Sequence, residues 1–259
     1  MPKSGSLVDA GRLAVTPVGV GTSYSAYGVA QTSFLVRAGD RGVLLDLGSG
    51  AFNRLQRLTD PEDLEAIVIT HLHPDHCVDL FAMRVYMAWG PGSGKTVPVF
   101  GPAGLQEQLV DFTGGDDGWD SFRFTGLDQP AGRRDLGDGL VLRWQEVPHA
   151  DPTFAIRLDW RGSSICFGAD CGPNDVLGEF AAGVGILILE CAFGTDPMVT
   201  EVAHLNARAA GAIAAAATPG RLLITHCYPH FDQREVLAEI AEEFDGAAAF
   251  AEQDAEVAA

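Results

Sequence analysis

The chain has few basic residues: 17 Lys and Arg among 259 positions, against 35 Asp and Glu, for a formal net charge of −18. Proteins that bind nucleic acid generally neutralise its phosphates with a basic patch. No dense run of Lys and Arg occurs here, so the composition argues against general nucleic-acid binding. An anionic substrate would have to be attracted locally, by bound cations or by helix N-termini.

Long apolar runs and a cysteine framework are also missing. No apolar stretch reaches the ~18 residues that a membrane-spanning helix needs, and residues 1–6 lack the apolar centre of a secretory signal. The five cysteines are odd in number, in a chain long enough to bury a core without disulfides. We therefore expect free cysteines, no membrane span and a cytoplasmic location.

The apolar pattern that is present predicts a layered α/β fold, because short apolar strands alternate with helical stretches. Without an internal repeat or a low-complexity linker, residues 1–259 are interpreted as one domain. The Gly- and Asp-rich segment 113–139 is interpreted as a substrate-covering loop or a plain exposed connection. The expected strands are 13–18, 32–37, 42–46, 66–70, 97–100, 140–147, 153–159, 163–168, 186–190 and 221–225, and the expected helices are 77–88, 104–112, 206–217 and 234–244.

Polar side chains with catalytic potential follow several of these strands. His71 follows strand 66–70, Asp170 follows strand 163–168, Glu190 ends strand 186–190 and His226 follows strand 221–225. Ligand sites in open α/β sheets lie beyond the carboxyl ends of the strands. We therefore expect these side chains to converge on one rim of the fold.

The seven histidines are clustered, since three of them fall within residues 71–76, His-Leu-His-Pro-Asp-His. His71 and His73 are two apart on an extended segment, so their rings point to the same side and can share one ion. Asp75 and His76 come from the turn after the proline and would reach a second ion. The clustering favours metal ligation over isolated polar roles, with zinc preferred and manganese or iron as alternatives.

The run His71-x-His73-x-Asp75-His76 at the end of an apolar strand resembles the signature of the metallo-β-lactamase superfamily. Segment 43–50 is similar to the family's early Asp-bearing strand and Gly turn. The resemblance covers nearly the whole chain and implies a four-layer αββα sandwich with two divalent metal ions. It implies that one ion takes His71, His73 and His149, that the other takes Asp75, His76 and His226, that Asp170 bridges them, and that Asp46 orients the ligand histidines.

Within that superfamily the chain resembles most closely the ribonuclease Z-like phosphodiesterases, whose motifs are matched by segments 97–102, 189–193 and 223–229. Ribonuclease Z proper has a long arm that grips transfer RNA, whereas only 20 residues separate His149 from Asp170 here. Leu205 and Asn206 also replace the hydroxyl residues of the branch's Gly-His-Ser-Thr motif. The chain thus looks more like arm-less relatives such as bacterial cyclic-nucleotide phosphodiesterases, and the resemblance implies a homodimer.

Three side chains are assigned catalytic roles. Two neighbouring ions can bring the pKa of a shared water toward ~7, which predicts a metal-bound hydroxide held by Asp75. His204, at the start of helix 206–217, is expected to protonate the leaving oxygen or bind the phosphate, and Glu190 to tune it. Non-catalytic alternatives are a helix-cap neighbour for His204 and a strand-end acceptor for Glu190. His230 would contact substrate phosphate or simply belong to the loop after His226.

The sequence therefore predicts a binuclear-metal hydrolase, foremost a phosphodiesterase acting on small anionic nucleotides, cyclic ones included. Three alternatives stay open. A transfer-RNA 3′-end endonuclease would need a basic surface beside the site, and a thioester, lactone or amide hydrolase would favour a wide apolar pocket. A metal-binding regulatory protein without catalysis is the third. Cys77, Cys171 and Cys227, which directly follow proposed ligands, are interpreted as small packing residues rather than as ligands or a redox switch.

Overall fold

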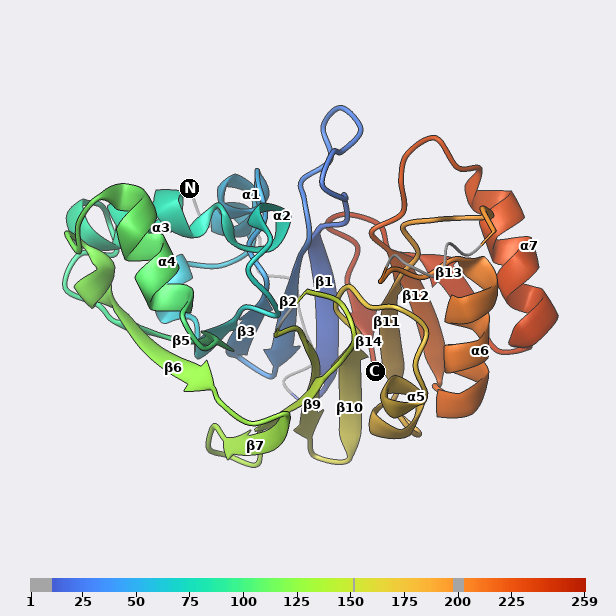
Figure 1. The fold of residues 1–259 in the computed structure, drawn as a ribbon. Helices are drawn as coiled ribbons and strands as arrows, with labels where there is room; N and C mark the ends of the chain where they lie inside the picture. Colours follow the sequence, from blue (N-terminus) through green and yellow to red (C-terminus); the bar gives the residue numbers. More distant parts are fainter. Residues whose placement is uncertain (1–10, 151, 198–202) are drawn as a thin grey trace.

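The computed structural model describes residues 11–150, 152–197 and 203–259. Two seven-stranded sheets face each other, and helices cover their outer surfaces (Figure 1). None of the helices in the described part of the chain is long and apolar enough to cross a membrane. Residues 1–6, which were interpreted as lacking a secretory signal, lie outside the described residues.

The first sheet has the strand order β14-β1-β2-β3-β4-β5-β6. Pairing is antiparallel from β14 to β3 and parallel from β3 to β6. Its strands are β1 (Leu13–Gly19), β2 (Ser33–Ala38), β3 (Arg41–Leu45), β4 (Ala66–Val68), β5 (Val97–Pro102), β6 (Phe122–Leu127) and β14 (Val257–Ala258).

The second sheet repeats this pattern in the order β7-β8-β9-β10-β11-β12-β13. Pairing is antiparallel from β7 to β10 and parallel from β10 to β13. Its strands are β7 (Ala131–Asp135), β8 (Val141–Glu146), β9 (Phe154–Trp160), β10 (Ser163–Phe167), β11 (Ile186–Glu190), β12 (Arg221–Thr225) and β13 (Ala248–Phe250).

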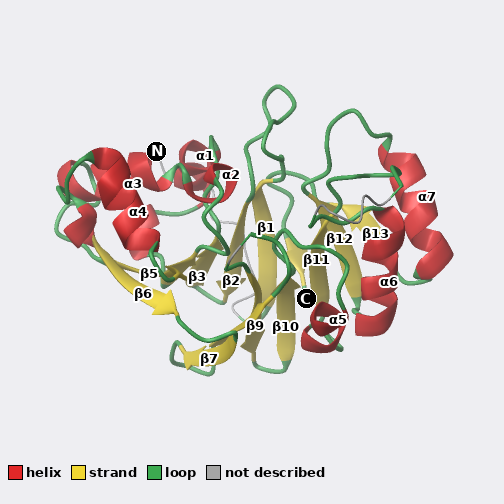
Figure 2. Ribbon diagram, viewed as in Figure 1, coloured by secondary structure: helices red, strands yellow, loops and turns green. Residues whose placement is uncertain are grey.

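Helices lie on both outer faces, as Figure 2 shows, with the earlier helices on the first sheet and the later ones on the second. On the first sheet they are α1 (Ala51–Leu58), α2 (Pro74–Cys77), α3 (Leu80–Trp89) and α4 (Leu105–Thr113), with the short 3-10 turns η1 (Pro61–Asp63) and η2 (Trp119–Ser121). On the second they are α5 (Asp175–Phe180), α6 (Ala207–Ala217) and α7 (Gln233–Glu243).

Three apolar layers hold these four layers of structure together. Because side chains alternate along a strand, Phe34 and Val36 of β2 enter the core between the sheets, while Leu35 enters the core under the helices of the first sheet. Phe167 of β10 packs against Phe34 with ring centres 5.1 Å apart, which joins the two sheets. The predicted αββα sandwich is therefore confirmed.

The structure corrects the sequence interpretation of segment 113–139, which is not one loop. It contains η2, β6 and β7, and β6 pairs with β5 through six residues. The edge strand β7 has the sequence Ala-Gly-Arg-Arg-Asp, so no apolar alternation could indicate it. The expected helix 77–88 is divided into α2 and α3, and α1, α5, β13 and β14 were not predicted. The single domain, the homodimer and the cytoplasmic location stay predictions.

Candidate metal centre

The carboxyl ends of the parallel strands in both sheets meet at one edge, near α2 and the loop that follows β1 in Figure 1. Histidine and carboxylate side chains gather there in four overlapping groups. Within each group one ligand atom per residue lies within 4.8 Å of the others. The groups are His71, His73 and His149; His71, His76 and Asp170; Asp75, His76 and His226; and His149, Asp170 and His204. The structure thus brings together all the proposed ligands.

One buried carboxylate, Asp46, orients two histidines of the run 71–76. The Nδ1 of His76 donates to Asp46 Oδ2 over 2.7 Å. The Nδ1 of His71 donates to the hydroxyl of Thr70 over 3.0 Å, and that hydroxyl donates to Asp46 Oδ2 over 2.9 Å. A carboxylate can only accept, so it holds the proton of His76 on Nδ1 and leaves Nε2 free to face the centre.

His149 and His226, which come from the second half of the chain, are each oriented by a separate hydrogen-bond partner. The Nδ1 of His149 donates to the carbonyl oxygen of Ala203 over 2.8 Å. The Nδ1 of His226 donates to the Thr32 hydroxyl over 2.9 Å, and Thr32 in turn donates to the carbonyl oxygen of Gly21. Both arrangements place the proton on Nδ1, so Nε2 again carries the free electron pair.

Three of the atoms that face the centre lack a hydrogen-bond partner in the described part of the chain. Among the described residues, His71 Nε2, His76 Nε2 and Asp170 Oδ1 are buried without a hydrogen-bond partner. Such an atom costs about 1–3 kcal/mol when nothing satisfies it. The His149 Nε2 and His73 Nδ1 atoms also face each other at 3.2 Å. Several free imidazole nitrogens and a carboxylate that converge in this way fit divalent cations of the zinc type.

The electrostatics differ from one histidine of the group to the next. Burial lowers the pKa of His226 to about 4, and burial together with neighbouring histidines lowers that of His71. For His76, burial is outweighed by the carboxylates of Asp170 and Asp46, which raise its pKa well above the usual value. Neutral imidazoles such as His226 and His71 keep a lone pair available at neutral pH, so protons compete little with a metal.

The backbone turns sharply where these side chains leave their strands. Asp46, Ala169 and His226 each follow a strand end with positive φ values of 57°, 57° and 48°. Residues other than glycine adopt this left-handed region at a cost, and it is frequent at functional sites. Gly48 is required for a different reason, because a Cβ there would lie 2.0 Å from the carbonyl oxygen of Asp75.

Comparison with known proteins agrees with this geometry. The family described as "Beta-lactamase superfamily domain" matches residues 41–227, well over half of the chain. The chain belongs to the β-lactamase superfamily. The resemblance seen in the sequence is thereby confirmed, and membership implies divalent metal ions at the His/Asp groups. Together these findings support a metal-dependent hydrolase.

Relatives within the superfamily cover most of this chain. An uncharacterized protein of Mycobacterium tuberculosis is 32% identical over 214 residues, 79% of this chain and 76% of that protein. The probable metallo-hydrolase YhfI of Bacillus subtilis is 29% identical over 235 residues, 88% and 91% of the two chains. Ribonuclease Z of Mycobacterium bovis is 28% identical over 265 residues, 90% and 94%.

Solved structures agree on the superfamily fold. The crystal structure of YhfI matches with a TM-score of 0.85 at 23% identity and covers 95% of this chain and 99% of its own. Human tRNase Z, short form, matches with a TM-score of 0.74 at 20% identity, with 94% and 98% covered. At these identities the likeness concerns the fold alone.

His204, a member of the fourth ligand group, forms a close pair with Glu190. The Nδ1 of His204 donates to Glu190 Oε1 over 2.7 Å. Burial raises the pKa of Glu190 to about 7, while donation from the backbone of Cys171 and Ala192 favours its charged form. Burial lowers the pKa of His204, but Glu190 outweighs this and raises it above the usual value. A protonated His204 would turn its Nε2 proton away from Glu190.

The cysteines next to the proposed ligands are packing residues in this structure, and all five cysteines are free. Cys171 is fully buried and Cys77 nearly so. Burial raises the pKa of Cys77 to about 12, which keeps it a thiol at neutral pH rather than a metal-binding thiolate.

Sequence reasoning missed three groups that contact Nδ1 of the ligand histidines, on the side of the ring away from the centre. Thr70 directly precedes His71, so its position in the strand could have indicated it. Thr32 and the carbonyl of Ala203 lie 194 and 54 residues from their histidines, and no local signal points to them. The structure places His230 outside the four ligand groups, with its Nδ1 at 3.1 Å from the Tyr24 hydroxyl.

Proposed function

We propose that the chain is a two-metal phosphodiesterase that acts on small nucleotide phosphodiesters, cyclic nucleotides among them. The observation that carries this proposal is the pair of Glu190 with His204, a member of the fourth ligand group. Phosphodiester cleavage at a ribose oxygen expels an alkoxide, which is a strong base and needs a proton as it leaves. A thioester expels a thiolate of far lower pKa, which needs no such donor. A histidine held by a buried carboxylate therefore favours a strongly basic leaving group, such as an alkoxide, over a thiolate.

The two ions, Asp75 and His204 would have separate roles in the reaction. Two divalent ions, zinc in the first place, would neutralise phosphate oxygens and activate water. Asp75 is nearly buried, and its Oδ2 lies 3.8 Å from Nε2 of both His76 and His226. Asp75 would hold the attacking water and accept its proton. His204 would give its Nε2 proton to the leaving oxygen, with Nδ1 and the charge held by Glu190.

The ligand atoms named in the sequence analysis would hold these ions in two sets that share one carboxylate. Asp170 suits this shared position because His76 Nε2 lies 3.4 Å from its Oδ1 and His226 Nε2 lies 3.1 Å from its Oδ2. The proposed sets are His71, His73, His149 and Asp170 for one ion, and Asp75, His76, His226 and Asp170 for the other.

A small substrate is favoured over transfer RNA by the surroundings of the site. Between His149 and Asp170 the described residues form the short hairpin of β9 and β10 instead of a long arm. No Lys or Arg is among the described residues that line the pocket beside His226.

Many arginines elsewhere are already paired with carboxylates. These pairs include Arg41 with Glu65, Arg54 with Asp254, Arg143 with Asp159, and Arg208 with Glu242. The relatives named Ribonuclease Z support phosphodiester chemistry and keep the tRNA endonuclease as the second candidate.

The test compares substrates that differ in their need for a proton donor. Purified protein with measured metal content is assayed on 3′,5′-cyclic AMP, bis(p-nitrophenyl) phosphate and p-nitrophenyl acetate, with and without a chelator. We expect chelator-sensitive cleavage of both phosphodiesters. The His204→Asn variant should lose about 10²- to 10⁴-fold on the cyclic nucleotide, the range for a general acid, and much less on the p-nitrophenyl diester, whose leaving group is a weak base.

The opposite pattern would reject the proposal. Cleavage of the acetate with both phosphodiesters inert would leave a metal-dependent hydrolase of another bond. Equal loss on both diesters would remove His204 as the proton donor. Processing of a pre-tRNA 3′ end with no activity on small diesters would favour the endonuclease.

A further inference from the structure

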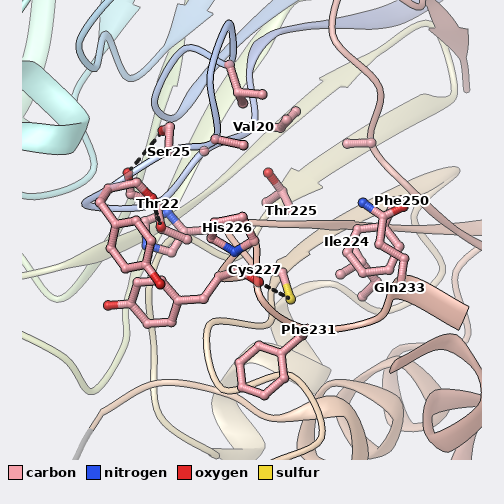
Figure 3. Close-up of a pocket in the computed structure, with 17 residues that line it drawn as sticks. Val20, Thr22, Ser25, Ile224, Thr225, His226, Cys227, Phe231, Gln233 and Phe250 are labelled. Atoms are coloured by element: carbon pink, nitrogen blue, oxygen red, sulfur yellow. Dashed lines mark hydrogen bonds between the residues drawn. The ribbon is translucent and has the colours of Figure 1, made fainter. Parts of the chain in front are cut away.

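A pocket of about 250 Å³ opens between the loop after β1 and the segment after β12. Figure 3 shows Thr22 and Ser25 on one side of His226, with Ile224 and Phe250 on the other. The pocket therefore shares His226 with the proposed metal centre, because His226 Nε2 lies 3.1 Å from Asp170 Oδ2. A molecule bound at the metals could extend into it.

Tyr24 and Tyr228 line this pocket with nearly parallel rings, and the ring of His230 beside them is nearly parallel to that of Tyr228. The ring centres of Tyr24 and Tyr228 are 5.0 Å apart with an angle of 19° between the planes, and those of Tyr228 and His230 are 5.9 Å apart with an angle of 17°. The Tyr24 hydroxyl lies 3.1 Å from His230 Nδ1, and the Ser23 and Tyr228 hydroxyls lie 3.3 Å apart. These contacts hold the rings in place before any ligand arrives.

The three rings are not part of the core. Tyr24 is 53% exposed, His230 is exposed, and Tyr228 is half-buried. An exposed, fixed set of aromatic faces costs stability by leaving apolar surface in water, so it points to a ligand that covers it.

The aromatic surface continues from these rings toward the proposed proton donor. His230 lies 4.2 Å from Phe231 between ring centres. The Phe231 ring packs on Gly194, where a Cβ would be only 2.3 Å away, and the neighbouring Phe193 lies 5.8 Å from His204. These contacts connect the rings beside the pocket with the segment that carries Phe193, next to His204.

We propose that Tyr24, Tyr228 and His230 form a stacking surface for the nucleobase of the substrate. This inference rests on the proposed function and adds that the protein recognises the nucleobase of the substrate. Base stacking on aromatic side chains suits a pocket with no Lys or Arg among its described lining residues, because it needs no charge and tolerates every base. The phosphate would lie at the metals and the base on the exposed rings.

A binding experiment tests the surface independently of turnover. Calorimetry on the zinc-loaded protein compares adenosine 5′-monophosphate with ribose 5-phosphate, which has the same phosphate and sugar but no base. We expect the nucleotide to bind roughly tenfold tighter or more, as a stacked base contributes about that much. Tyr228→Leu and Tyr24→Leu should remove this difference, and Tyr228→Phe should keep it. Tyr27→Leu, at a fully exposed position of the same loop, is the matched control.

A kinetic experiment uses two diesters with the same leaving group, p-nitrophenyl thymidine 5′-phosphate and methyl p-nitrophenyl phosphate. Tyr24→Leu should raise KM for the nucleoside ester by about tenfold, leaving kcat and the methyl ester unchanged. Equal affinity for nucleotide and ribose 5-phosphate, or equal changes on both diesters, would overturn the stacking surface even if phosphodiesters are cleaved. Tyrosine-dependent nucleotide binding without phosphodiester cleavage would instead overturn the proposed reaction and keep the surface.

Discussion

The two halves of the molecule have the same strand pattern, yet they use their buried carboxylates in opposite ways. Asp46 follows β3 and Asp170 follows β10, which are equivalent strands in the two sheets. Asp46 accepts from Thr70 and His76 on the far side of the histidine rings. Asp170 faces the centre, and its Oδ1 accepts no hydrogen bond from the described residues.

The pKa directions show how this placement changes the same residue type. Burial by itself raises the pKa of both carboxyl groups. For Asp46 burial prevails and its pKa is raised despite the contact with His76. For Asp170 the imidazoles of His226 and His76 outweigh burial and hold its pKa well below the usual range. Asp46 in the first half therefore orients the ligand histidines, whereas Asp170 in the second half supplies negative charge at the centre. This difference predicts how variants of the two residues should behave.

The largest effect is expected for Asp170→Asn, since this side chain would serve both ions. Loss of an outer partner alone typically costs about 10–100-fold in metal affinity or activity, so loss of a shared ligand should exceed about 100-fold. Metal content per chain and kcat/KM measure it. Asp159→Asn, which alters only pairing with Arg143 and Arg157, is the control. Two ions retained at unchanged affinity would contradict the shared role.

The next effect is expected for Asp46→Asn, which would reverse the hydrogen bond to His76. The amide oxygen would accept from the backbone N–H of Thr70, as Asp46 Oδ1 does, and this turns the amide nitrogen toward His76. An amide nitrogen donates, so His76 would carry its proton on Nε2 and could not ligate through that atom. Metal affinity should fall about 10–100-fold. Asp79→Asn is the control, because Asp79 accepts from the backbone of Phe52 and does not contact the histidines. If Asp46→Asn and Asp79→Asn differ in stability but bind metal equally well, Asp46 contributes to folding and does not orient His76.

A smaller effect, confined to catalysis, is expected for Glu190→Gln. The carboxylate raises the pKa of His204, so its removal should lower that pKa. His204 acts as an acid only when protonated, and activity should therefore be lost at lower pH on the alkaline side of the profile. Above neutral pH we expect a loss of about tenfold or more on an alkoxide leaving group. The pH dependence of kcat measures this effect. If the variant binds its full metal content and its activity falls at the same alkaline pH as that of the parent protein, Glu190 does not set the pKa of His204.

The smallest effect is expected for Thr32→Val, which removes the only side-chain oxygen known to hold His226 Nδ1 in the described structure. One histidine of one half is affected, so we expect about a tenfold loss of metal affinity, the lower end of the range for outer partners. Thr32→Ser keeps the hydroxyl and should behave as the parent protein. A Val variant with unchanged affinity, measured by chelator competition, would show that backbone position alone orients His226.

Local sequence was enough to indicate the first half of the site. His71, His73, Asp75 and His76 lie within six residues, where one strand end and one turn set their relative positions. The strands with clear apolar runs were also predicted, because burial on both faces leaves a continuous apolar stretch. Edge strand β7 escaped prediction because its polar residues gain their structure only from pairing with β8.

The sequence by itself therefore determined the family, the layered fold and the list of candidate ligands, since these depend on spacing along the chain and on apolar periodicity. Only the tertiary structure decided which atom of each ligand faces the centre. Thr32 and the Ala203 carbonyl reach their histidines across 194 and 54 residues. Such contacts form when separate strand ends meet at one edge of the sheets, and no local pattern records them.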